Sequence, residues 1–427
     1  MQKLERVVLF TTKKDYLLFL LFALFLFCLS ISYQYYKYHQ LTKFDSQLVN
    51  AVVLKQYLKT KTTKTGKHKS YEVLQLKSSD GAIFYTIAKK SLPNIKNKTV
   101  ELEVWAGKVS FYDYLRKYFA FSKILKIDSK PTLQQKLAHD IAMQHSDKNI
   151  SALYKALFLA QPLPQKQQTL FSQLGISHLI AISGFHLGIL TFLLYFLFKQ
   201  PYKFLQKHFF PYRNEQRDLF FITAFILLAY MLTIGSPPSL LRAYAMLLIG
   251  FFLYERGVKI ISMQTLFITI ILLLALDIRL LFSIGFWLSA AGVFYIFLFF
   301  VSFKNLTKKQ QFFFIPIWIY LCMLPYSLAI FGNFSLYHPL SILASLLFTL
   351  FYPLALLLHF LGVGDLLDSP LHSLLNAAPN AVTIKLPLAL LGVIASLSFV
   401  SVFYKKTLYL LLGLLIFVFI KSIYNVT

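Results

Sequence analysis

The chain has 427 residues, of which 57% are hydrophobic and 14% are charged, against roughly 25% charged residues in a typical soluble domain. A soluble protein this apolar could not cover its own surface, so the composition excludes an ordinary cytosolic enzyme, a disordered scaffold and a disulfide-rich secreted module, and leaves a polytopic membrane protein with some soluble mass. The 43 Lys and Arg residues outnumber the 17 Asp and Glu residues, and the net charge of +26 indicates either a polyanionic partner or a solvated lysine-rich surface.

The first apolar run covers residues 16–36 and follows several basic residues. The run is longer than the core of a normal signal peptide, and no small-residue cleavage site follows it. It is long enough to cross about 30 Å of hydrocarbon. We therefore predict that residues 1–36 hold a transmembrane helix with a cytoplasmic N-terminus.

Residues 37–112 have a different character, because short β-branched and aromatic stretches alternate with turn-forming clusters such as SSDG. About five strands at this spacing predict a small β-barrel. A barrel of the oligonucleotide/oligosaccharide-binding (OB) type is the natural candidate, and a small β-sandwich is the alternative. We expect an OB-like β-domain here.

Residues 113–175 are predicted to form an amphipathic helical linker. The stretch FYDYLRKYFAFSKILKI, which begins at residue 111, mixes aromatic and basic side chains and suits a helix at a membrane surface. A second helix is expected from Pro131 to about His145, and a third over about residues 149–159.

The remaining chain consists of apolar runs, predicted as a channel domain over 176–380 and C-terminal transmembrane helices over 381–427. With the first helix, they make about ten transmembrane or re-entrant helices in a polytopic α-helical fold. Basic loops at 199–217, 255–262 and 304–310 fall on alternate turns, so all three can be cytoplasmic and the β-domain extracytoplasmic. Individual spans are expected near 176–198, 218–234, 238–254, 263–281, 284–303, 311–332, 339–362, 384–403 and 407–424.

The direction of the run 339–362 is ambiguous. A full crossing would place the acidic loop with Asp365 and Asp368 inside and the basic pair Lys405 and Lys406 outside, against the usual bias. If Pro353 breaks the run into a re-entrant pair, the charges fall on the expected sides. We favour the re-entrant interpretation.

Polar groups inside apolar runs are costly and by default face protein or water. They gather in the segment 175–188 with its small residues, in the segment 235–243 with Arg242, in the segment 277–289, and in the polar connection 331–339. Cavity lining and an ordinary capped helix start are both open for the first segment. Arg242 either reaches the interface or points inward as a phosphate or carboxylate partner. Asp277 and Arg279 should not face each other on a helix, so Asp277 could pair with another helix.

Catalytic interpretations have less support. Ser183 and His186 could approach each other, but no oxyanion hole can be identified, and His178 with His186 lacks an acidic or Cys companion for a metal. A phosphate-binding G-x-x-x-x-G-K-[ST] loop does not occur in the sequence, so transport would need a separate energy source. We expect no enzyme activity, no metal and no cofactor.

Four segments resemble the competence protein family ComEC in consecutive order: LYKALFLAQ…LGISHLIAISGFHLGIL (153–190), LLAYMLTIGSPPSLLRAYAMLLIGF (227–251), ALDIRLLFSIGFWLSAAGV (275–293) and MLPYSLAIFGNFSL (323–336). The segment HLIAISGFHLG is the most specific. The resemblance covers roughly residues 150–360, and the preceding helix and β-domain resemble the family's N-terminal OB-like region more weakly.

The resemblance implies a multi-pass inner-membrane channel that takes single-stranded DNA into the cytoplasm during natural transformation. The family's motif positions map onto expected channel-lining residues: His178, Ser183, Gly184, His186, Gly188, Ser239, Arg242, Gly285 and Ser289. In the β-domain a group of basic and aromatic side chains could hold single strands by phosphate attraction and base stacking: Lys55, Lys59, Lys67, Lys69, Lys77, Lys89, Tyr71, Tyr85 and Trp105.

Departures from the family pattern limit what is carried over. One helix precedes the β-domain where many members have two or three, Trp287 stands where Gln is common, and Ile278 follows Asp277 where Pro is common. The metal-binding run of the metallo-β-lactamase-like domain found in many members is absent from the sequence. We therefore expect strand degradation to need a separate nuclease, beside a separate DNA receptor and an energising protein, and an oligomer is possible.

Two other functions are compatible with the sequence. An envelope polysaccharide or lipid-linked transporter or transferase would use the same basic domain for anionic glycans or headgroups. An intramembrane hydrolase would use Ser183.

Overall fold

The structure, a computed structural model, describes residues 10, 12–62, 68–88, 92–93, 95–128, 132–257, 262–377 and 379–426. The chain divides into two compact units. We call Thr12–His139 with Ile271–Ser283 the sheet unit, and Asp140–Ile270 with Ile284–Thr427 the helical unit. Each unit is described separately.

The sheet unit begins with α1 (Lys13–Thr42), a helix of 30 residues. Thr12 and Asp15 form a capping box in which the amide of each donates to the side chain of the other. Most of its apolar side chains are exposed, as expected for a helix surrounded by lipid. The helix continues beyond the expected end at residue 36, because Tyr38 donates a hydrogen bond to the carbonyl of Val109 and packs against Phe111.

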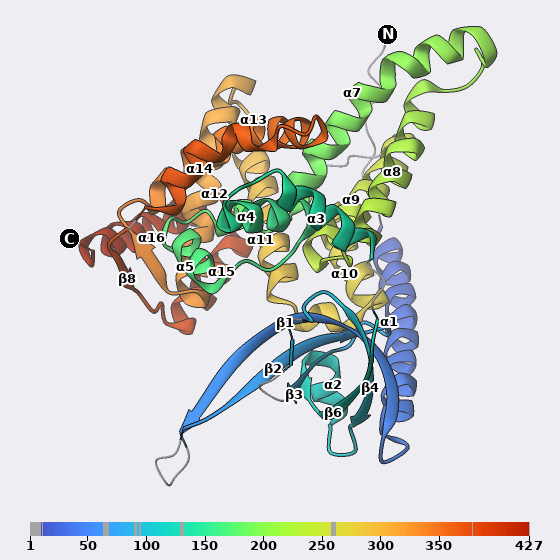
Figure 1. Cartoon of the computed structure of the whole chain (residues 1–427). Coiled ribbons are helices and arrows are strands. Elements are labelled where there is room, and N and C mark those ends of the chain that lie inside the picture. Colours follow the sequence, from blue (N-terminus) through green and yellow to red (C-terminus); the bar gives the residue numbers. More distant parts are fainter. Residues whose placement is uncertain are drawn as a thin grey trace. The chain divides into compact units, whose positions relative to one another are not determined.

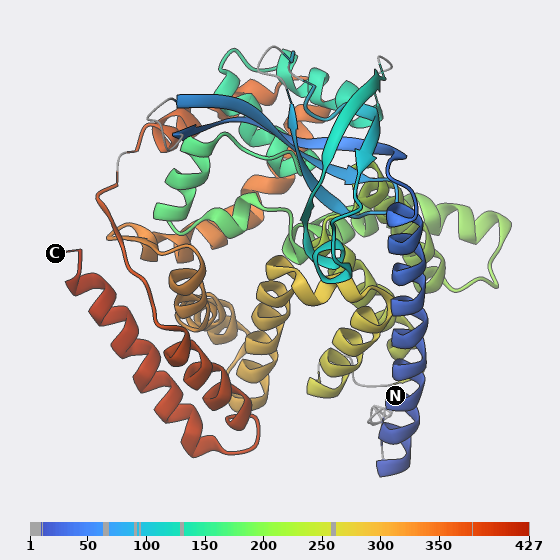
Figure 2. The ribbon, with the colours of Figure 1, turned by 90° about the horizontal axis from the view of Figure 1, so that it is seen from below.

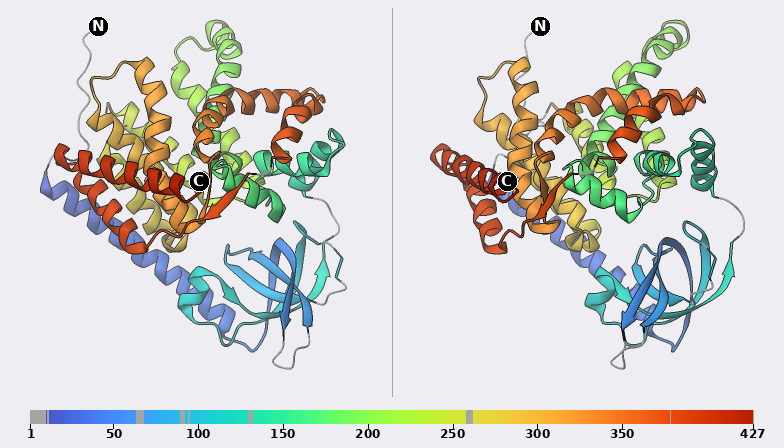
Figure 3. Two further views of the ribbon diagram at one scale, coloured as in Figure 1. Left: turned by 90° about the vertical axis from the view of Figure 1, so that its left-hand side faces the viewer. Right: turned by 60° about the vertical axis from the view of Figure 1, so that its left-hand side comes forward.

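Six strands form one sheet in the order β5-β3-β2-β1-β4-β6. The sheet curls so that its two edges approach, and the Ser122 hydroxyl of β6 donates to Thr86 of β3 at 2.9 Å (Figure 3). The buried face carries aliphatic side chains such as Val53, Leu74 and Leu102. The strands are β1 (Gln47–Thr62), β2 (His68–Ser78), β3 (Ile83–Ala88), β4 (Thr99–Trp105), β5 (Tyr118–Phe119) and β6 (Phe121–Ile127) (Figure 1).

The prediction of a membrane-surface helix from residue 111 is wrong for most of its length. Only α2 (Phe111–Arg116) is helical, and β5 and β6 follow it. Residues of β6 pair with β4, for example Ser122 with Val104. Pairing with a ready-made edge therefore outweighed the local helical pattern, so the sheet extends to Ile127.

The segment η1 (Ile278–Phe282) is a 3-10 helix and packs on the sheet of the same unit. Asp277 caps it, and Arg279 Nε lies 3.1 Å from the Asp277 carboxylate. The expectation that these two side chains do not meet is therefore wrong, because it assumed a continuous α-helix. Arg279 also donates to the carbonyl of Asp80 at 2.9 Å and lies against Gly81 in the β2–β3 turn.

The helical unit contains the remaining apolar helices. Among the described residues of the whole chain, six helices are long and apolar enough to cross a membrane, so the expected count of about ten is not established.

In the helical unit, α7 and α8 lie side by side, and α15 and α16 form an antiparallel pair (Figures 1 and 2). The elements are α4 (Lys148–Leu159), α5 (Gln165–Gln173), α6 (Ser177–Ile180), α7 (Gly184–Phe209), α8 (Glu215–Thr233), α9 (Pro238–Glu255), α11 (Ile284–Ser302), α12 (Lys308–Ile330), β7 (Asn333–Ser335), η2 (His338–Leu340), α13 (Ser341–Phe360), η3 (Gly364–Leu367), α14 (Asp368–Leu375), β8 (Ala381–Thr383), α15 (Leu388–Val400) and α16 (Lys405–Tyr424). Two helices link the units: α3 (Leu133–Met143) and α10 (Met263–Leu276).

Pro353 does not break the run 339–362. It lies inside α13, which is continuous for 20 residues. Nothing in the sequence indicated the short antiparallel sheet in which β7 pairs with β8.

One end of the helical unit carries the first two basic loops. Arg213 forms an ion pair with Asp218 near the start of α8, and Arg217 binds Glu255 at the end of α9 at 3.1 Å. The loop 199–217 and the end of α9 therefore lie together, as the charge pattern predicted. Lys259 of the second loop lies outside the described residues.

Candidate functional site

The motif segments meet at the opposite end of α7 and α9. Ser183 caps α7: its hydroxyl accepts from the amide of Phe185 at 3.3 Å, and its own amide donates to His186 Nδ1 at 3.2 Å. Pro238 is the first residue of α9, where its missing N–H costs nothing. Ser239 donates to the carbonyl of Ile182 at 2.7 Å, which fixes the start of α9 against the α6–α7 turn.

Arg242 is the centre of this convergence and is only 4% exposed. Its Nε and Nη2 atoms donate to the hydroxyl of Ser289 on α11 at 3.0 and 2.5 Å, and Nη1 lies 2.8 Å from the sulfur of Met246. Among the described residues, no carboxylate lies within ion-pair distance of it. A buried cation held by one hydroxyl and one thioether is incompletely compensated, and such a group favours an anion.

Gly184 brings α7 and α9 together. A Cβ atom at this position would lie 3.1 Å from Ala243 Cβ and 3.5 Å from Arg242 Nη2, so any side chain here would push on the guanidinium. Gly188, one turn later, is exposed, and a Cβ atom there would meet nothing within 4 Å. The close approach of α7 and α9 therefore depends on Gly184 and not on Gly188.

The two histidines of the motif have different surroundings. His186 is fully buried, and its ring packs edge-on against Tyr352 and Phe348 of α13. Its Nε2 atom makes no hydrogen bond of ordinary geometry to a described residue, although the Leu179 backbone is near. His178 is exposed, with Nδ1 3.0 Å from the carbonyl of Gly175 and Nε2 3.2 Å from Ser345 Oγ of α13.

The Ser183–His186 contact is accounted for by capping. Ser183 Oγ lies 3.2 Å from His186 Nδ1, but that nitrogen already accepts the Ser183 amide. His186 also has no carboxylate beside it among the described residues to orient it as a base.

His338 belongs to the polar connection that the sequence singled out, but its role was not foreseen. Its ring is buried against Gly175, where a Cβ atom would come within 2.7 Å of the ring. Gly175 also has a φ of +72°, which L side chains rarely adopt. Tyr320 Oη lies 3.1 Å from His338 Nδ1. In the sequence, Gly175 stands just before the motif, but nothing there indicates that His338 packs against it.

Gly285 and Ser289 lie one turn apart on α11. Ser289 holds the guanidinium, as described above. Gly285 is exposed and lies outside these contacts. The structure therefore brings together Ser183, Gly184, His186, Ser239, Arg242 and Ser289, while Gly188 and Gly285 lie at the edge and His178 joins through Gly175 and Ser345.

In the sheet unit, the strand register places several predicted contacts on the outer face. Lys59 pairs with Tyr71, and Lys55 pairs with Gln75, which pairs in turn with Tyr85. Lys55 and Lys59 are exposed, and exposed Tyr57 lies between them on the same strand face. This part of the sheet therefore presents alternating cations and aromatic rings.

The other predicted contacts are more scattered. Lys77 is half-buried, and its pKa is lowered by burial and by the nearby Arg279, with Asp277 acting in the opposite direction. Trp105 is exposed and pairs with exposed Phe121 on the neighbouring strand. Lys67 and Lys89 lie outside the described residues, and Lys69 lies on β2 with its side chain outside them.

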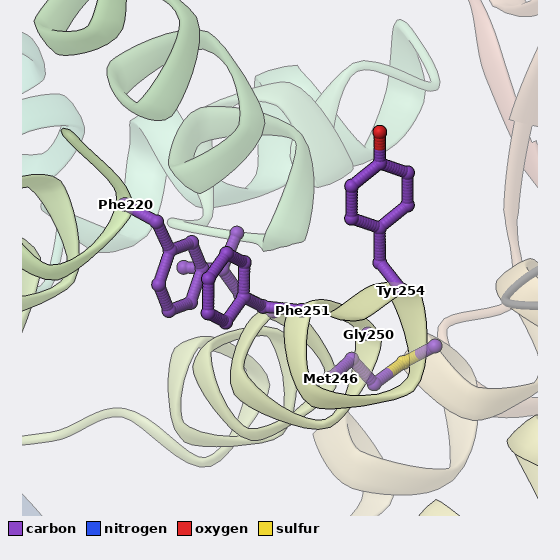
Figure 4. Close-up of a pocket in the computed structure, with 6 residues that line it drawn as sticks. Phe220, Met246, Gly250, Phe251 and Tyr254 are labelled. Atoms are coloured by element: carbon purple, nitrogen blue, oxygen red, sulfur yellow. The ribbon is translucent and has the colours of Figure 1, made fainter. Parts of the chain in front are cut away.

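A groove of about 340 Å³ lies between α8 and α9. Figure 4 shows Phe220 and Phe251 stacked face to face, with Tyr254 pointing away from them. A second groove of about 240 Å³ shares these three residues. The lining of the first groove is almost wholly apolar, which suits hydrocarbon and gives a phosphate no partner, so we assign that groove no part in the site. Met246 lines it and also touches Arg242.

A comparison of the chain with known protein families agrees with the resemblance seen in the motif segments. The family model described as Competence protein matches residues 160–425. The searches of curated proteins and of solved structures found no match. The matched region covers more than half of the chain and contains every motif residue around Arg242, so the chain belongs to the Competence protein family.

Proposed function

We propose that this chain is an inner-membrane channel protein that passes single-stranded DNA into the cytoplasm during natural transformation. The observation that carries the proposal is Arg242, a buried cation that no carboxylate neutralises among the described residues, at the point where three motif segments of a Competence-family chain meet. A guanidinium has the planar fork that suits phosphate, and a nucleic-acid strand offers one phosphate per nucleotide.

The uncharged partners of Arg242 support transport better than permanent binding of the strand. Conduction requires contacts that attract the strand yet release it. One hydroxyl and one thioether can be displaced by a passing phosphate, whereas a carboxylate partner would compete with it.

The structure has a closed arrangement of this site, because Arg242 is 4% exposed and His186 is not exposed at all. A strand can reach Arg242 only if α7, α9 and α11 separate or α13 moves from His186. We therefore propose that the motif is a constriction that opens during uptake, rather than the wall of a permanently open pore.

The sheet unit supports an extracytoplasmic DNA-binding role. If β5 and β6 are taken as one strand interrupted at Ala120, the strand order supports a five-stranded, partly open barrel of the OB type. The lysines and tyrosines on its outer face would hold phosphates and stack bases without sequence preference.

The proposed orientation follows the charges. The basic α7–α8 loop and the end of α9 would face the cytoplasm, as would the N-terminus of α1. The motif end of α7 and α9 and the β-domain would then face outward, where DNA arrives. A receptor, a nuclease and an energising protein would be separate partners.

Deletion of the gene followed by tracking of fluorescent DNA tests the proposal. DNA should accumulate outside the inner membrane and fail to reach the cytoplasm. Complementation with Arg242→Glu should not restore uptake, although the protein inserts normally. The matched control is Arg256→Glu, an exposed arginine at the other end of the same helix, which should restore it. Normal uptake with Arg242→Glu, or normal uptake after deletion with a defect in envelope polysaccharide, would overturn the proposal.

A further inference from the structure

Three titratable side chains in the helical unit form a chain of contacts away from Arg242. His145 Nδ1 lies 2.9 and 3.1 Å from the two carboxylate oxygens of Asp368, and His145 Nε2 lies 3.0 Å from Nε2 of His359. His359 Nδ1 lies 2.7 Å from the carbonyl of Ala355. The His145 side chain is buried, stacked on the ring of Tyr154.

The partners fix where the protons are. The Ala355 carbonyl can only accept, so His359 carries its proton on Nδ1 and, when neutral, offers a lone pair at Nε2. His145 must then donate from Nε2, and one further proton is shared between His145 Nδ1 and Asp368. An additional proton on His359 would set two N–H groups against each other. Loss of the shared proton would set a lone pair against a carboxylate.

A metal ion fits the two facing nitrogens less well than a proton does. Two Zn–N bonds of about 2.0–2.1 Å at a tetrahedral angle hold their nitrogens about 3.3 Å apart. The observed 3.0 Å is instead an ordinary N–H···N hydrogen bond. No group of three His, Cys, Asp or Glu side chains suited to a metal occurs in the described parts of the chain.

These contacts also show where the ends of α13 lie. The segment between residue 140 and α6 contains α4, with 12 residues, and α5, with 9, which are both too short to cross a bilayer. Gln144 binds the carbonyl of His359 and the amide of Gly364, just beyond the end of α13. Before its start, Asn333 and Ser335 of β7 bind Ser172 and the carbonyl of Gln173. Although α13 is one of the six helices long and apolar enough to cross a membrane, both of its ends are thus bound to a segment that is too short to cross, which favours placing both ends on one side.

The surface of α13 agrees with this placement. Its buried face packs Phe348 and Tyr352 around His186. The other face exposes leucines at helical spacing: Leu343, Leu347, Leu350, Leu354 and Leu357. A helix with a protein-packed face and an apolar face, and with both ends on one side, lies in the membrane along that side instead of crossing it.

We propose that His145, His359 and Asp368 form a proton-binding latch that holds α13 along the outer side of the helical unit, over His186. The latch is closed while His359 is neutral and accepts from His145, and it releases α13 when His359 gains a proton. Other titratable groups beside it, among the residues that the structure describes, are Tyr154 on α4 and the Asp147–His372 ion pair, at 3.3 Å, which joins the start of α4 to α14.

Thiol labelling of the full chain in detergent tests the latch. Cys28 and Cys322 are replaced by alanine, and Ala355→Cys places a thiol on the buried face of α13. Phe360→Cys, at a position 89% exposed on the same helix, corrects for the ionisation of the thiol itself. The ratio of the two labelling rates, that of Ala355→Cys divided by that of Phe360→Cys, should be low at neutral pH. It should rise toward about pH 5 by up to about tenfold per pH unit, since a single proton controls release.

Variants of the latch residues test whether the pH dependence of the labelling ratio arises there. His359→Gln and Asp368→Asn, which act at opposite ends of the chain of contacts, should each raise the ratio at neutral pH and flatten its pH dependence. His139→Gln, at an exposed histidine, should change nothing. A flat ratio in the parent chain, or an unchanged pH profile in both variants, would overturn the latch. If EDTA raises the ratio at neutral pH and added zinc lowers it again, a metal ion closes the latch, and the proposal of a proton is overturned. The measurement does not involve DNA, so it stands apart from the proposed transport.

Discussion

Replacing Arg242 with methionine should separate stability from function. Arg242 is 4% exposed and has no carboxylate partner among the described residues, so burying its charge opposes folding. Even a buried ion pair can often be replaced by apolar side chains of similar volume with no loss of stability, or with a gain of about 1–4 kcal/mol, and Arg242 lacks the compensating charge of such a pair. We therefore expect Arg242→Met to be at least as stable as the parent chain, and to take up no DNA.

Ser289→Ala is the informative comparison. It removes the hydroxyl that accepts from Nε and Nη2 while leaving the charge buried. Hydrogen bonds to charged groups contribute about 1.5–3 kcal/mol, so this variant should be destabilised by about that amount. Unfolding can be followed by the reaction of a fluorescent maleimide with Cys322, which is fully buried, after Cys28 is replaced.

The two variants together decide whether Arg242 is functional or structural. A residue that serves the fold should lose stability and uptake in parallel. If Arg242→Met melts earlier than the parent by as much as Ser289→Ala does, the guanidinium is part of the packing and its proposed role in transport fails.

The other predictions concern a backbone position, the sheet and the approach of two helices. Gly175→Ala should destabilise the chain by about 2 kcal/mol or more, because φ is positive and the new methyl group would strike the His338 ring, whereas Gly188→Ala should be close to neutral in the same unfolding assay. Lys55→Glu with Lys59→Glu should weaken oligonucleotide binding by the full chain and lower the slope of log affinity against log salt by about 0.7 for each phosphate that the variant no longer neutralises. Gly184→Leu should abolish uptake by separating α7 from α9.

Each of these three predictions has an outcome that would contradict it. Equal stability of the Gly175 and Gly188 variants would mean that the His338 ring yields to the added methyl group. Oligonucleotide binding without salt dependence would make the sheet a structural collar. Binding should be measured on the full chain, because a fragment ending at residue 112 would lack β5 and β6. Normal uptake with Gly184→Leu would mean that α7 and α9 need not approach closely at this point.

Local and compositional signals were readable from the sequence. The apolar runs predicted most helices, and the cap at Ser183 and the proline start of α9 follow from residue types at fixed positions. The motif order also identified the family. These features depend on neighbours in sequence, so one chain suffices to infer them.

The features that were missed depend on partners distant in sequence. The strands β5 and β6 form because the β4 edge is available, and Arg279 meets Asp277 because a 3-10 turn replaces an α-helix. Pro353 is accommodated inside α13. His145 and Asp368, 223 residues apart, carried no common signal. Such contacts are set by packing, which periodicity does not encode.

Cross-linking of DNA arrested during uptake tests the central claim most directly. A photoreactive thiol reagent is attached at Ser289→Cys, beside the guanidinium, or at Trp287→Cys, whose native side chain is 43% exposed on the same helix. The DNA carries a protein block at its trailing end, so that it stops within the membrane. We expect DNA adducts at position 289 and few or none at position 287. DNA that reaches the cytoplasm with no adduct at 289, or with equal adducts at both positions, would contradict a passage beside Arg242.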